Sequence, residues 1–257
     1  SQHSPTLIVN DVDGDGLPEI VNAPHYRVQI FSAQTGELKA EVPWDVGRNY
    51  GVLLSRGRGK GQPKDIYIVC DFVLHVDRLA LVDGQWTHVW GHKYSDPNNP
   101  RPGARQKYLR VGPNPVTDLD ADGRDEMLYM LVDADNDDQW HLRVRDAQTG
   151  EIEGDIAGIW LWSVSDLDGD GQCELVYTPT DQKRPPTVCE LRVARYAGGT
   201  LEDLDVLPAV RPLLTQLKLP LNADSIADEG LQDLLQPDLN GDGQPEVLVA
   251  AAPPLHP

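Results

Sequence analysis

Acidic side chains recur at a fixed spacing in four short stretches of the chain. The first reads DVDGDGLPE from Asp11 to Glu19, and the others begin at Asp118 (DLDADGRDE), Asp166 (DLDGDGQCE) and Asp238 (DLNGDGQPE). Positions 1, 3 and 5 of each stretch carry a carboxylate or an Asn, and position 9 is always Glu. Short oxygen-bearing side chains at alternating positions of a tight loop can converge on one hard cation.

Calcium fits this donor set, because Ca²⁺ takes six to eight oxygen ligands in a flexible shell. Gly at position 6 permits the positive φ that wraps the chain around an ion, and position 7 would offer only its backbone carbonyl. The sequence therefore predicts four structural Ca²⁺ sites, which we call the Asp11, Asp118, Asp166 and Asp238 loops. Their expected ligands are Asp11, Asp13, Asp15, Leu17 and Glu19; Asp118, Asp120, Asp122, Arg124 and Glu126; Asp166, Asp168, Asp170, Gln172 and Glu174; and Asp238, Asn240, Asp242, Gln244 and Glu246.

The same residues could form metal-free hairpin turns rich in Asp and Gly. Four copies that all keep Glu at position 9 disfavour this, and the unneutralised carboxylates would repel one another. An EF-hand needs Glu at position 12 and a helix on both sides, whereas position 12 is Asn22, Tyr129, Tyr177 and Val249. Short β-branched or apolar runs follow position 9, so the loops are predicted to lie in β-hairpins.

Each loop occupies the same place in a longer repeat. In the first repeat, strands are expected near 6–10, 19–24, 27–32 and 37–42, and four consecutive antiparallel strands make one propeller blade. The word AQTGE, at 33–37 and again at 147–151, marks the same turn in two repeats. We expect one all-β propeller domain. Its four full blades lie at about 6–43, 51–94, 114–157 and 159–207, a half blade lies at 234–257, and insertions lie at 95–113 and 208–233.

The second repeat has lost the acidic loop. Residues 56–65 read RGRGKGQPKD, so cationic side chains stand where the other repeats have carboxylates. We expect a hairpin without metal, held by its glycines rather than by a Lys or Arg head group in the ligand position. The half blade favours a segment of a longer propeller over a ring that closes irregularly, and a short helix is expected near 224–235.

Composition restricts the class of protein. The 257 residues carry a formal net charge of −19. Part of this negative charge comes from the carboxylates that are expected to bind metal. The chain lacks the clustered Lys and Arg that nucleic-acid binding needs. No apolar run approaches the roughly 20 residues of a membrane span. Three cysteines are too few for a disulfide scaffold, and Cys173 with Cys189 could either pair or remain two thiols. Calcium loops suit an extracellular, cell-surface or periplasmic location.

The loop pattern followed by an apolar strand and an Ala-Pro corner resembles the FG-GAP/VCBS repeat. The corners here are Val21–Pro24 and Ala250–Pro253. That repeat builds the propellers of integrin α-subunits and of many bacterial secreted proteins, and the resemblance covers nearly the whole chain. It implies structural calcium in the hairpin between the first two strands of a blade, and ligand binding on the opposite face.

No catalytic motif of the GxSxG, HExxH, P-loop or CxxC type is present. The first hypothesis is a non-enzymatic binding or adhesion module that recognises an anionic glycan or a protein partner. The second is a part of a propeller-type polysaccharide lyase, similar to rhamnogalacturonan lyases, and the third is an accessory subunit of a larger assembly. A basic and aromatic stretch is the candidate ligand site, although it could instead be an ordinary connection between blades. Its residues are Trp86, Trp90, His92, Tyr94, Arg101, Arg105, Lys107 and Arg110.

Overall fold

The fold is taken from a computed structural model of the chain. It describes residues 7–24, 26–43, 51–55, 61–70, 75–94, 107–110, 115–133, 137, 139–181, 189–212, 214–215, 233–234, 238, 240–244, 246–247 and 249–251. Within these ranges the regular elements are all strands. Backbone contacts divide the chain into two units, 1–104 with 147–150, and 105–146 with 151–257. Each unit is described by itself.

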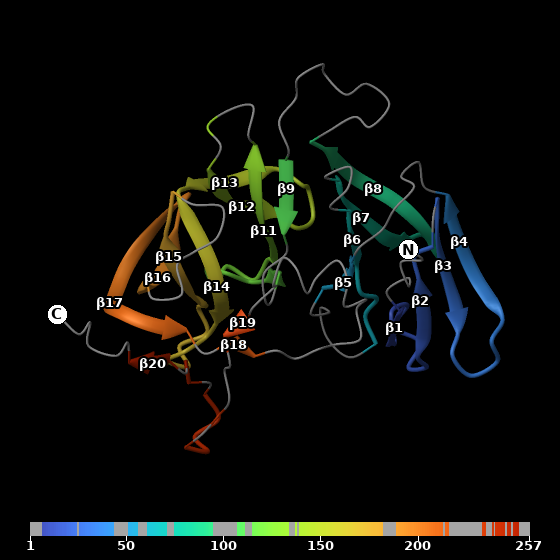
Figure 1. The fold of residues 1–257 in the computed structure, drawn as a ribbon. Helices are drawn as coiled ribbons and strands as arrows, with labels where there is room; N and C mark the ends of the chain where they lie inside the picture. The colour runs from blue at the N-terminus through green and yellow to red at the C-terminus, as the bar shows by residue number, and fades with distance from the viewer. Residues whose placement is uncertain are drawn as a thin grey trace. The chain divides into compact units, whose positions relative to one another are not determined.

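The first unit contains two four-stranded antiparallel sheets (Figure 1). In both sheets each strand pairs with the next one along the chain, in the orders β1-β2-β3-β4 and β5-β6-β7-β8. The strands are β1 (Leu7–Asn10), β2 (Glu19–Asn22), β3 (Arg27–Ser32), β4 (Leu38–Pro43), β5 (Gly51–Leu54), β6 (Ile66–Cys70), β7 (His75–Val82) and β8 (Gln85–Lys93).

The second unit contains two larger sheets and a short strand pair. In the third sheet, β9 and β10 both pair with β11, and the order continues through β12 to β13. The fourth sheet has the order β14-β15-β16-β17-β20, and β18 pairs with β19. The strands are β9 (Lys107–Arg110), β10 (Val116–Thr117), β11 (Glu126–Asp133), β12 (Trp140–Asp146), β13 (Ile152–Ala157), β14 (Ile159–Ser165), β15 (Glu174–Pro179), β16 (Cys189–Ala197), β17 (Thr200–Pro212), β18 (Leu214–Thr215), β19 (Asp233–Leu234) and β20 (Val249–Ala251).

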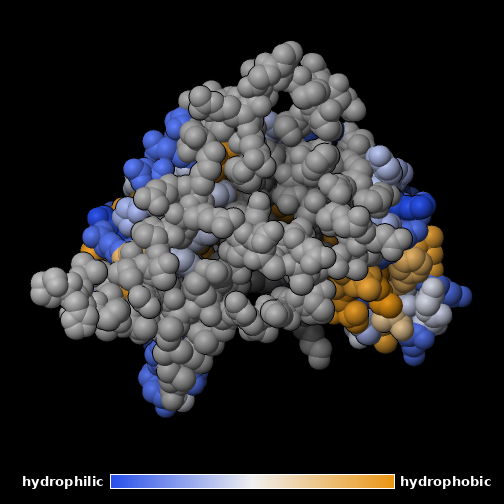
Figure 2. Space-filling model, in the orientation of Figure 1, coloured by the Kyte–Doolittle hydropathy of each residue, from blue (hydrophilic) through white to orange (hydrophobic). Residues whose placement is uncertain are grey.

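The hydrophobic pattern of each strand decides which faces are buried. In the first sheet, alternate residues such as Val21, Val28 and Ile30 enter a core that the second sheet completes, as the period of two in a strand requires. The other face is more exposed, with Leu7 and Val9 at 60% and 62%. Figure 2 shows apolar surface gathered over this part of the first unit.

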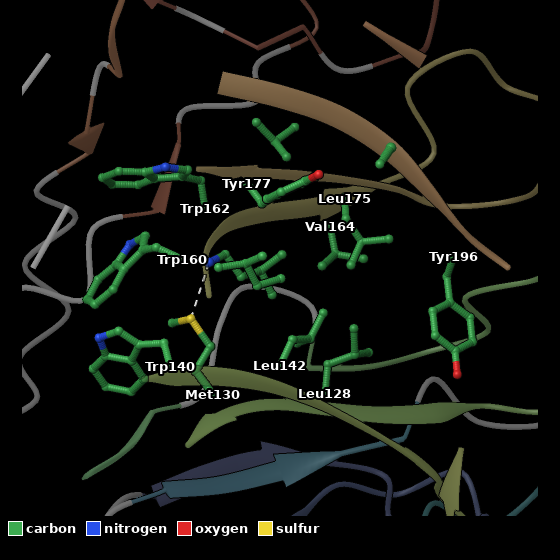
Figure 3. Close-up of a cluster of buried hydrophobic side chains, with 14 of the residues drawn as sticks. Leu128, Met130, Trp140, Leu142, Trp160, Trp162, Val164, Leu175, Tyr177 and Tyr196 are labelled. Carbon is green, nitrogen blue, oxygen red and sulfur yellow. Dashed lines mark hydrogen bonds between the residues drawn. The ribbon is translucent and has the colours of Figure 1, made fainter. Parts of the chain in front are cut away.

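Strand β14 of the second unit is buried on both faces. β14 reads IWLWSVS and six of its seven residues are buried, which is the near-continuous apolar run expected of a strand covered on both sides. In Figure 3, Trp140, Trp160 and Trp162 lie in a row at one end of this core. The rings of Trp140 and Trp160 pack edge to face with their centroids 5.3 Å apart, which is a favourable aromatic geometry.

A turn of the AQTG type packs into the first unit. The Ala147 carbonyl accepts bonds from the Tyr67 hydroxyl at 3.1 Å and from the Trp90 indole N–H at 3.2 Å. Arg78 donates to the Gln148 carbonyl at 2.5 Å. A Cβ on Gly150 would lie 2.6 Å from the Trp90 ring. These contacts explain why residues 147–150 group with the first unit.

The predicted fold class is confirmed: the chain is all-β, with consecutive antiparallel strands arranged as the blades of a partial propeller. The hairpins flanking the Asp11, Asp118 and Asp166 loops form between the expected strands. Cys173 and Cys189 are both buried and are not joined by a disulfide.

Four details differ from the sequence prediction. Strand β9 lies inside the stretch predicted as the insertion 95–113, and β17 runs to Pro212, beyond the predicted end of its blade. In the predicted half blade, β20 joins the fourth sheet by pairing with residues 210–212. A long edge strand offers unpaired backbone groups, and β20 pairs with those at the end of β17. Of the predicted helix, residues 224–232 lie outside the described residues, and residues 233–234 form β19.

Candidate metal centres

Each acidic loop is shaped by hydrogen bonds from its own backbone to its first carboxylate. The Asp at position 1 accepts the N–H of position 6 at 3.0–3.1 Å in all four loops. The side chains at positions 3 and 5 accept the N–H two residues further on, as in the Asp11 loop, where Leu17 N–H donates to Asp15 at 2.8 Å. These short-range bonds are Asx turns, and they draw the oxygens of positions 1, 3 and 5 to one side of the loop.

The Glu at position 9 holds the loop onto the sheet. One of its carboxylate oxygens accepts the backbone N–H of position 2, at 3.0 Å from Val12, 2.6 Å from Leu119 and 2.8 Å from Leu167. Glu19, Glu126 and Glu174 are only 1–2% exposed. A buried carboxylate needs compensation for its lost hydration, so each of these loops has a carboxyl group for which a nearby cation is favourable.

Carboxylate oxygens converge in every loop. In each group below, one oxygen from every member lies within 4.8 Å of the others. This distance suits side-chain oxygens placed around one ion with metal–oxygen distances of about 2.3–2.6 Å. The groups are Asp11, Asp13 and Asp15; Asp118, Asp120 and Asp122; Asp166, Asp168 and Glu174; and Asp238, Asp242 and Glu246.

In the Asp11 loop a lysine ammonium reaches the acidic group. Lys39 Nζ, from β4, lies 2.5 Å from Asp13, 3.1 Å from Asp15 and 2.8 Å from Glu19. The Asp13 carboxylate, followed by that of Glu19, raises the pKa of the Lys39 ammonium above its ordinary value. A positive charge is therefore stabilised at the point where positions 3, 5 and 9 meet.

The Asp166 loop holds a guanidinium in the same way. Arg195, from β16, donates through Nε to Glu174 at 2.8 Å and through Nη2 to Asp168 at 2.7 Å and Asp170 at 2.6 Å. Positions 3, 5 and 9 are again the acceptors. Two loops thus hold a cationic group against the oxygens that were predicted as metal ligands.

The Asp118 loop has no comparable cation among the contacts of the described residues. Arg124, at position 7, pairs with Asp122 at 2.6 Å and Asp146 at 3.2 Å. Within the described part of the chain, Asp118 Oδ1 is a buried acceptor without a hydrogen-bond partner. Burial, with a further contribution from Asp120, raises the pKa of Glu126 to about 8, although the Leu119 N–H bond opposes the shift.

Positive φ is required at two positions of each loop. At position 6, Gly16, Gly123, Gly171 and Gly243 have φ between 88° and 93°. Position 4 is also left-handed, and it is Gly in three loops but Ala121, with φ 62°, in the Asp118 loop. Gly at position 6 was the basis of the sequence prediction, although Gly at position 4 in three copies also indicates a left-handed backbone.

The non-acidic hairpin of the second repeat abuts the Asp11 loop. Lys64 donates its backbone N–H to the Val12 carbonyl at 2.8 Å and its ammonium to Asn10 at 2.7 Å. A Cβ on Gly14 would lie 2.8 Å from the Gly61 carbonyl oxygen. Residues 56–60 lie outside the described residues, so how the rest of this turn is held stays a prediction.

The candidate ligand-binding residues are placed only in part. Trp86 packs against the core of the first unit, and Trp90 donates to the Ala147 carbonyl. The rings of His92 and Tyr94 lie 4.3 Å apart. Arg101 and Arg105 lie outside the described residues, while Lys107 and Arg110 begin and end β9, whose side chains are also outside them. A single basic and aromatic surface therefore remains a prediction.

Comparison with known proteins gives likenesses of fold. No protein-family model matches the chain, and no curated protein matches it. Among solved structures, the rhamnogalacturonan lyase YesW is 16% identical with a TM-score of 0.46, covering 82% of this chain and 41% of the lyase. The Dos1 propeller is 10% identical with a TM-score of 0.43, covering 78% and 49%.

An Agrocybe aegerita lectin that recognises non-reducing terminal N-acetylglucosamine is 14% identical with a TM-score of 0.49. The match covers 96% of this chain and 61% of the lectin. The chain thus spans about two fifths to three fifths of the length of these three proteins. Identities of this order carry no information on what this chain binds. No helix long and apolar enough to cross a membrane occurs in the described part of the chain.

Proposed function

We propose that the four acidic loops bind structural Ca²⁺, and that the chain is a calcium-stabilised, extracytoplasmic propeller of the FG-GAP/VCBS kind that serves as a binding, adhesion or assembly module. The observation that carries this proposal is the convergence of three carboxylate oxygens within 4.8 Å in each of four separate loops. One such group on a surface is unremarkable, but four at the same place in a repeat need a common cause.

The arrangement of charge in three loops supports the binding of a cation there. Lys39 and Arg195 bring positive groups to two of the acidic groups. In the third, Asp118 Oδ1 is buried without a hydrogen-bond partner among the described residues. A buried acceptor that lacks a partner is costly, and a metal ion would satisfy it.

Oxygen ligands select the ion. The donor set contains carboxylates, an Asn amide and backbone carbonyls, which suit Ca²⁺ or Mg²⁺ rather than Zn²⁺ or Cu²⁺. Five protein oxygens from one loop favour Ca²⁺, because Mg²⁺ usually keeps several waters and takes one or two carboxylates. The residues that would hold the ion are those at positions 1, 3, 5, 7 and 9. The bound ion would neutralise the carboxylates and fix the loop between its two strands.

The parts of the blades outside the acidic loops support the recognition role. The Asp11, Asp118 and Asp166 loops occupy the hairpins between the first two strands of their blades, which leaves other loops and strands free to contact a protein partner or an anionic glycan. The His92–Tyr94 ring pair at the end of β8 offers an aromatic surface of the kind that stacks on sugars.

Calcium-dependent stability tests the proposal. A site at a hundred times its Kd adds about 2.7 kcal/mol to the free energy of unfolding, so four sites should raise the melting temperature by more than about 10 °C. Melting is measured by calorimetry in calcium, in EDTA and in EDTA with excess magnesium. Equal curves in calcium and EDTA would contradict the proposal, and recovery by magnesium alone would contradict the choice of ion.

The recognition role needs a separate experiment. The calcium-loaded protein is passed over immobilised neutral and anionic glycans, with an H92A/Y94A variant as the control. Retention on anionic glycans that this variant loses supports a binding module. Release of unsaturated sugar ends from a pectic substrate would show a lyase instead.

A further inference from the structure

Two positions of a blade, both outside the acidic loop, face the loop from the same sheet. The first position lies opposite the Glu at position 9: Glu174 is the backbone partner of Arg195, and Glu126 is the partner of Asp146. The second follows the AQTGE turn by two residues, and it is Lys39 in the first sheet and Glu153 in the third. The strand register therefore makes Arg195 equivalent to Asp146, and the shared turn makes Lys39 equivalent to Glu153.

These two positions carry opposite charge in different blades. Lys39 in the first sheet and Arg195 in the fourth each contact positions 3, 5 and 9 of their loops at 2.5–3.1 Å. In the third sheet both positions are acidic, Asp146 and Glu153. Asp146 is 6% exposed and binds Arg124, and Glu153 lies in electrostatic range of Asp120 and Asp122.

We infer that Lys39 and Arg195 are built-in counter-cations that compete with Ca²⁺ for their loops, whereas the Asp118 loop depends on Ca²⁺ for its neutralisation. The inference rests on the proposed calcium sites and deepens them. A cation held against three carboxylate oxygens occupies the place of the ion, so Ca²⁺ must displace it before binding, and the apparent affinity falls. Without calcium, the same group screens the carboxylates and keeps the hairpin folded.

The consequence is a hierarchy among the blades. Removal of calcium should leave the β1–β2 and β14–β15 hairpins folded, because Lys39 and Arg195 replace the ion. The β10–β11 hairpin should open, because among the described residues the cationic contact of the Asp118 loop is that of Arg124, and Asp146 and Glu153 add two further negative charges. Calcium depletion would then act first on the third blade.

Reciprocal charge changes test the inference. K39M removes the counter-cation from the Asp11 loop, and E153K places an ammonium at the equivalent position beside the Asp118 loop. Matched controls are R27M, which removes a positive charge from β3 of the same blade, and E151K, which makes the same charge change two residues from Glu153. K39Q and E153Q serve as milder variants, and all proteins are first shown to fold in calcium.

The readout is hydrogen exchange of the separate hairpins, with and without EDTA. In the unaltered protein, EDTA should speed exchange of β10–β11 by at least about tenfold and leave β1–β2 nearly unchanged. K39M should make β1–β2 sensitive to EDTA and raise the calcium affinity of its loop by about tenfold. E153K should remove the sensitivity of β10–β11, and both controls should match the unaltered protein.

The possible outcomes distinguish the counter-cation role from the proposed calcium sites. Equal responses of β1–β2 and β10–β11 in the unaltered protein, or an unchanged β1–β2 response in K39M and K39Q, would overturn the counter-cation role while leaving the calcium sites in place. Hairpins that all ignore calcium would overturn the proposed function, and the counter-cation role with it.

Discussion

Ala121 is the one non-glycine residue at position 4 of the acidic loops, and it has a φ of 62°. The left-handed region costs an L-residue roughly 1 kcal/mol, whereas glycine enters it freely. In the Asp11, Asp166 and Asp238 loops, the Gly at this position donates its N–H to the first Asp at 2.6–2.8 Å. In the Asp118 loop the matching acceptor, Asp118 Oδ1, has no hydrogen-bond partner among the described residues.

We therefore expect A121G to stabilise the protein by about 1 kcal/mol, through relief of backbone strain. Urea unfolding in excess calcium measures the change. The opposite substitution, G14A, is the matched control, since it adds a Cβ at φ 80° and 2.8 Å from the Gly61 oxygen. It should destabilise by more than about 1 kcal/mol. An A121G variant less stable than the unaltered protein would contradict the account of this loop.

Glu126 gives the Asp118 loop a dependence on pH. Its pKa of about 8, which burial raises from 4.5, keeps it protonated near neutrality in the metal-free protein. The folded chain then binds a proton that the unfolded chain has lost, so the metal-free protein loses stability as the pH rises from about 4.5 to about 8. Calcium requires the carboxylate, so its affinity for this loop should increase with pH until about 8 and then become level.

Calorimetric calcium titrations near neutral pH, in two buffers of different ionisation enthalpy, measure the protons released. A difference in heat that disappears in D118A would assign the release to this loop. Equal heats per calcium in both buffers would contradict the expected protonation of Glu126.

At the scale of elements, the AQTG turn and strand β8 form a contact that can be tested. Trp90 donates to the Ala147 carbonyl, and its ring fills the space that a side chain on Gly150 would need. W90F should cost about 1–2 kcal/mol, because the buried Ala147 carbonyl loses one of its two donors and the ring loses volume. G150A should cost more than about 2 kcal/mol, because the added Cβ meets Trp90 and φ is 76°.

Urea unfolding of both variants measures these losses. W86F is the control, since Trp86 lies on the same strand and packs against the core of the first unit. W90F and W86F of equal stability would show that the turn contact contributes nothing specific.

The strands and loops were predictable because their signals are local. A period of two in hydrophobicity marks strands such as β2 and β3, and the Asp–Gly–Glu spacing marks the hairpin turn. Lys39 and Arg195 were not identified, because their contacts with the loops depend on the register between strands. Strand β9 has only four residues, Lys107–Arg110, and β20 has three. Such short strands are defined by the edge they join rather than by a pattern of their own.

At the scale of the molecule, the repeat was the strongest signal in the sequence. It predicted consecutive antiparallel strands through four sheets, which the structure confirms. It also predicted a half blade at 234–257, and within that stretch β20 pairs with β17 and so extends the fourth sheet. A repeat alignment assigns each strand to its own blade, but a free edge on β17 can pair with whatever strand reaches it.

The measurement that tests the central claim most directly is the anomalous diffraction of crystals grown in calcium, combined with the metal content of the same protein. The account predicts four Ca²⁺ per chain, one each in the Asp11, Asp118, Asp166 and Asp238 loops, coordinated by positions 1, 3, 5, 7 and 9. Residues 56–65 should hold none, since their cationic side chains repel the ion. Acidic loops without anomalous density, or an ion bound by residues 56–65, would contradict the account.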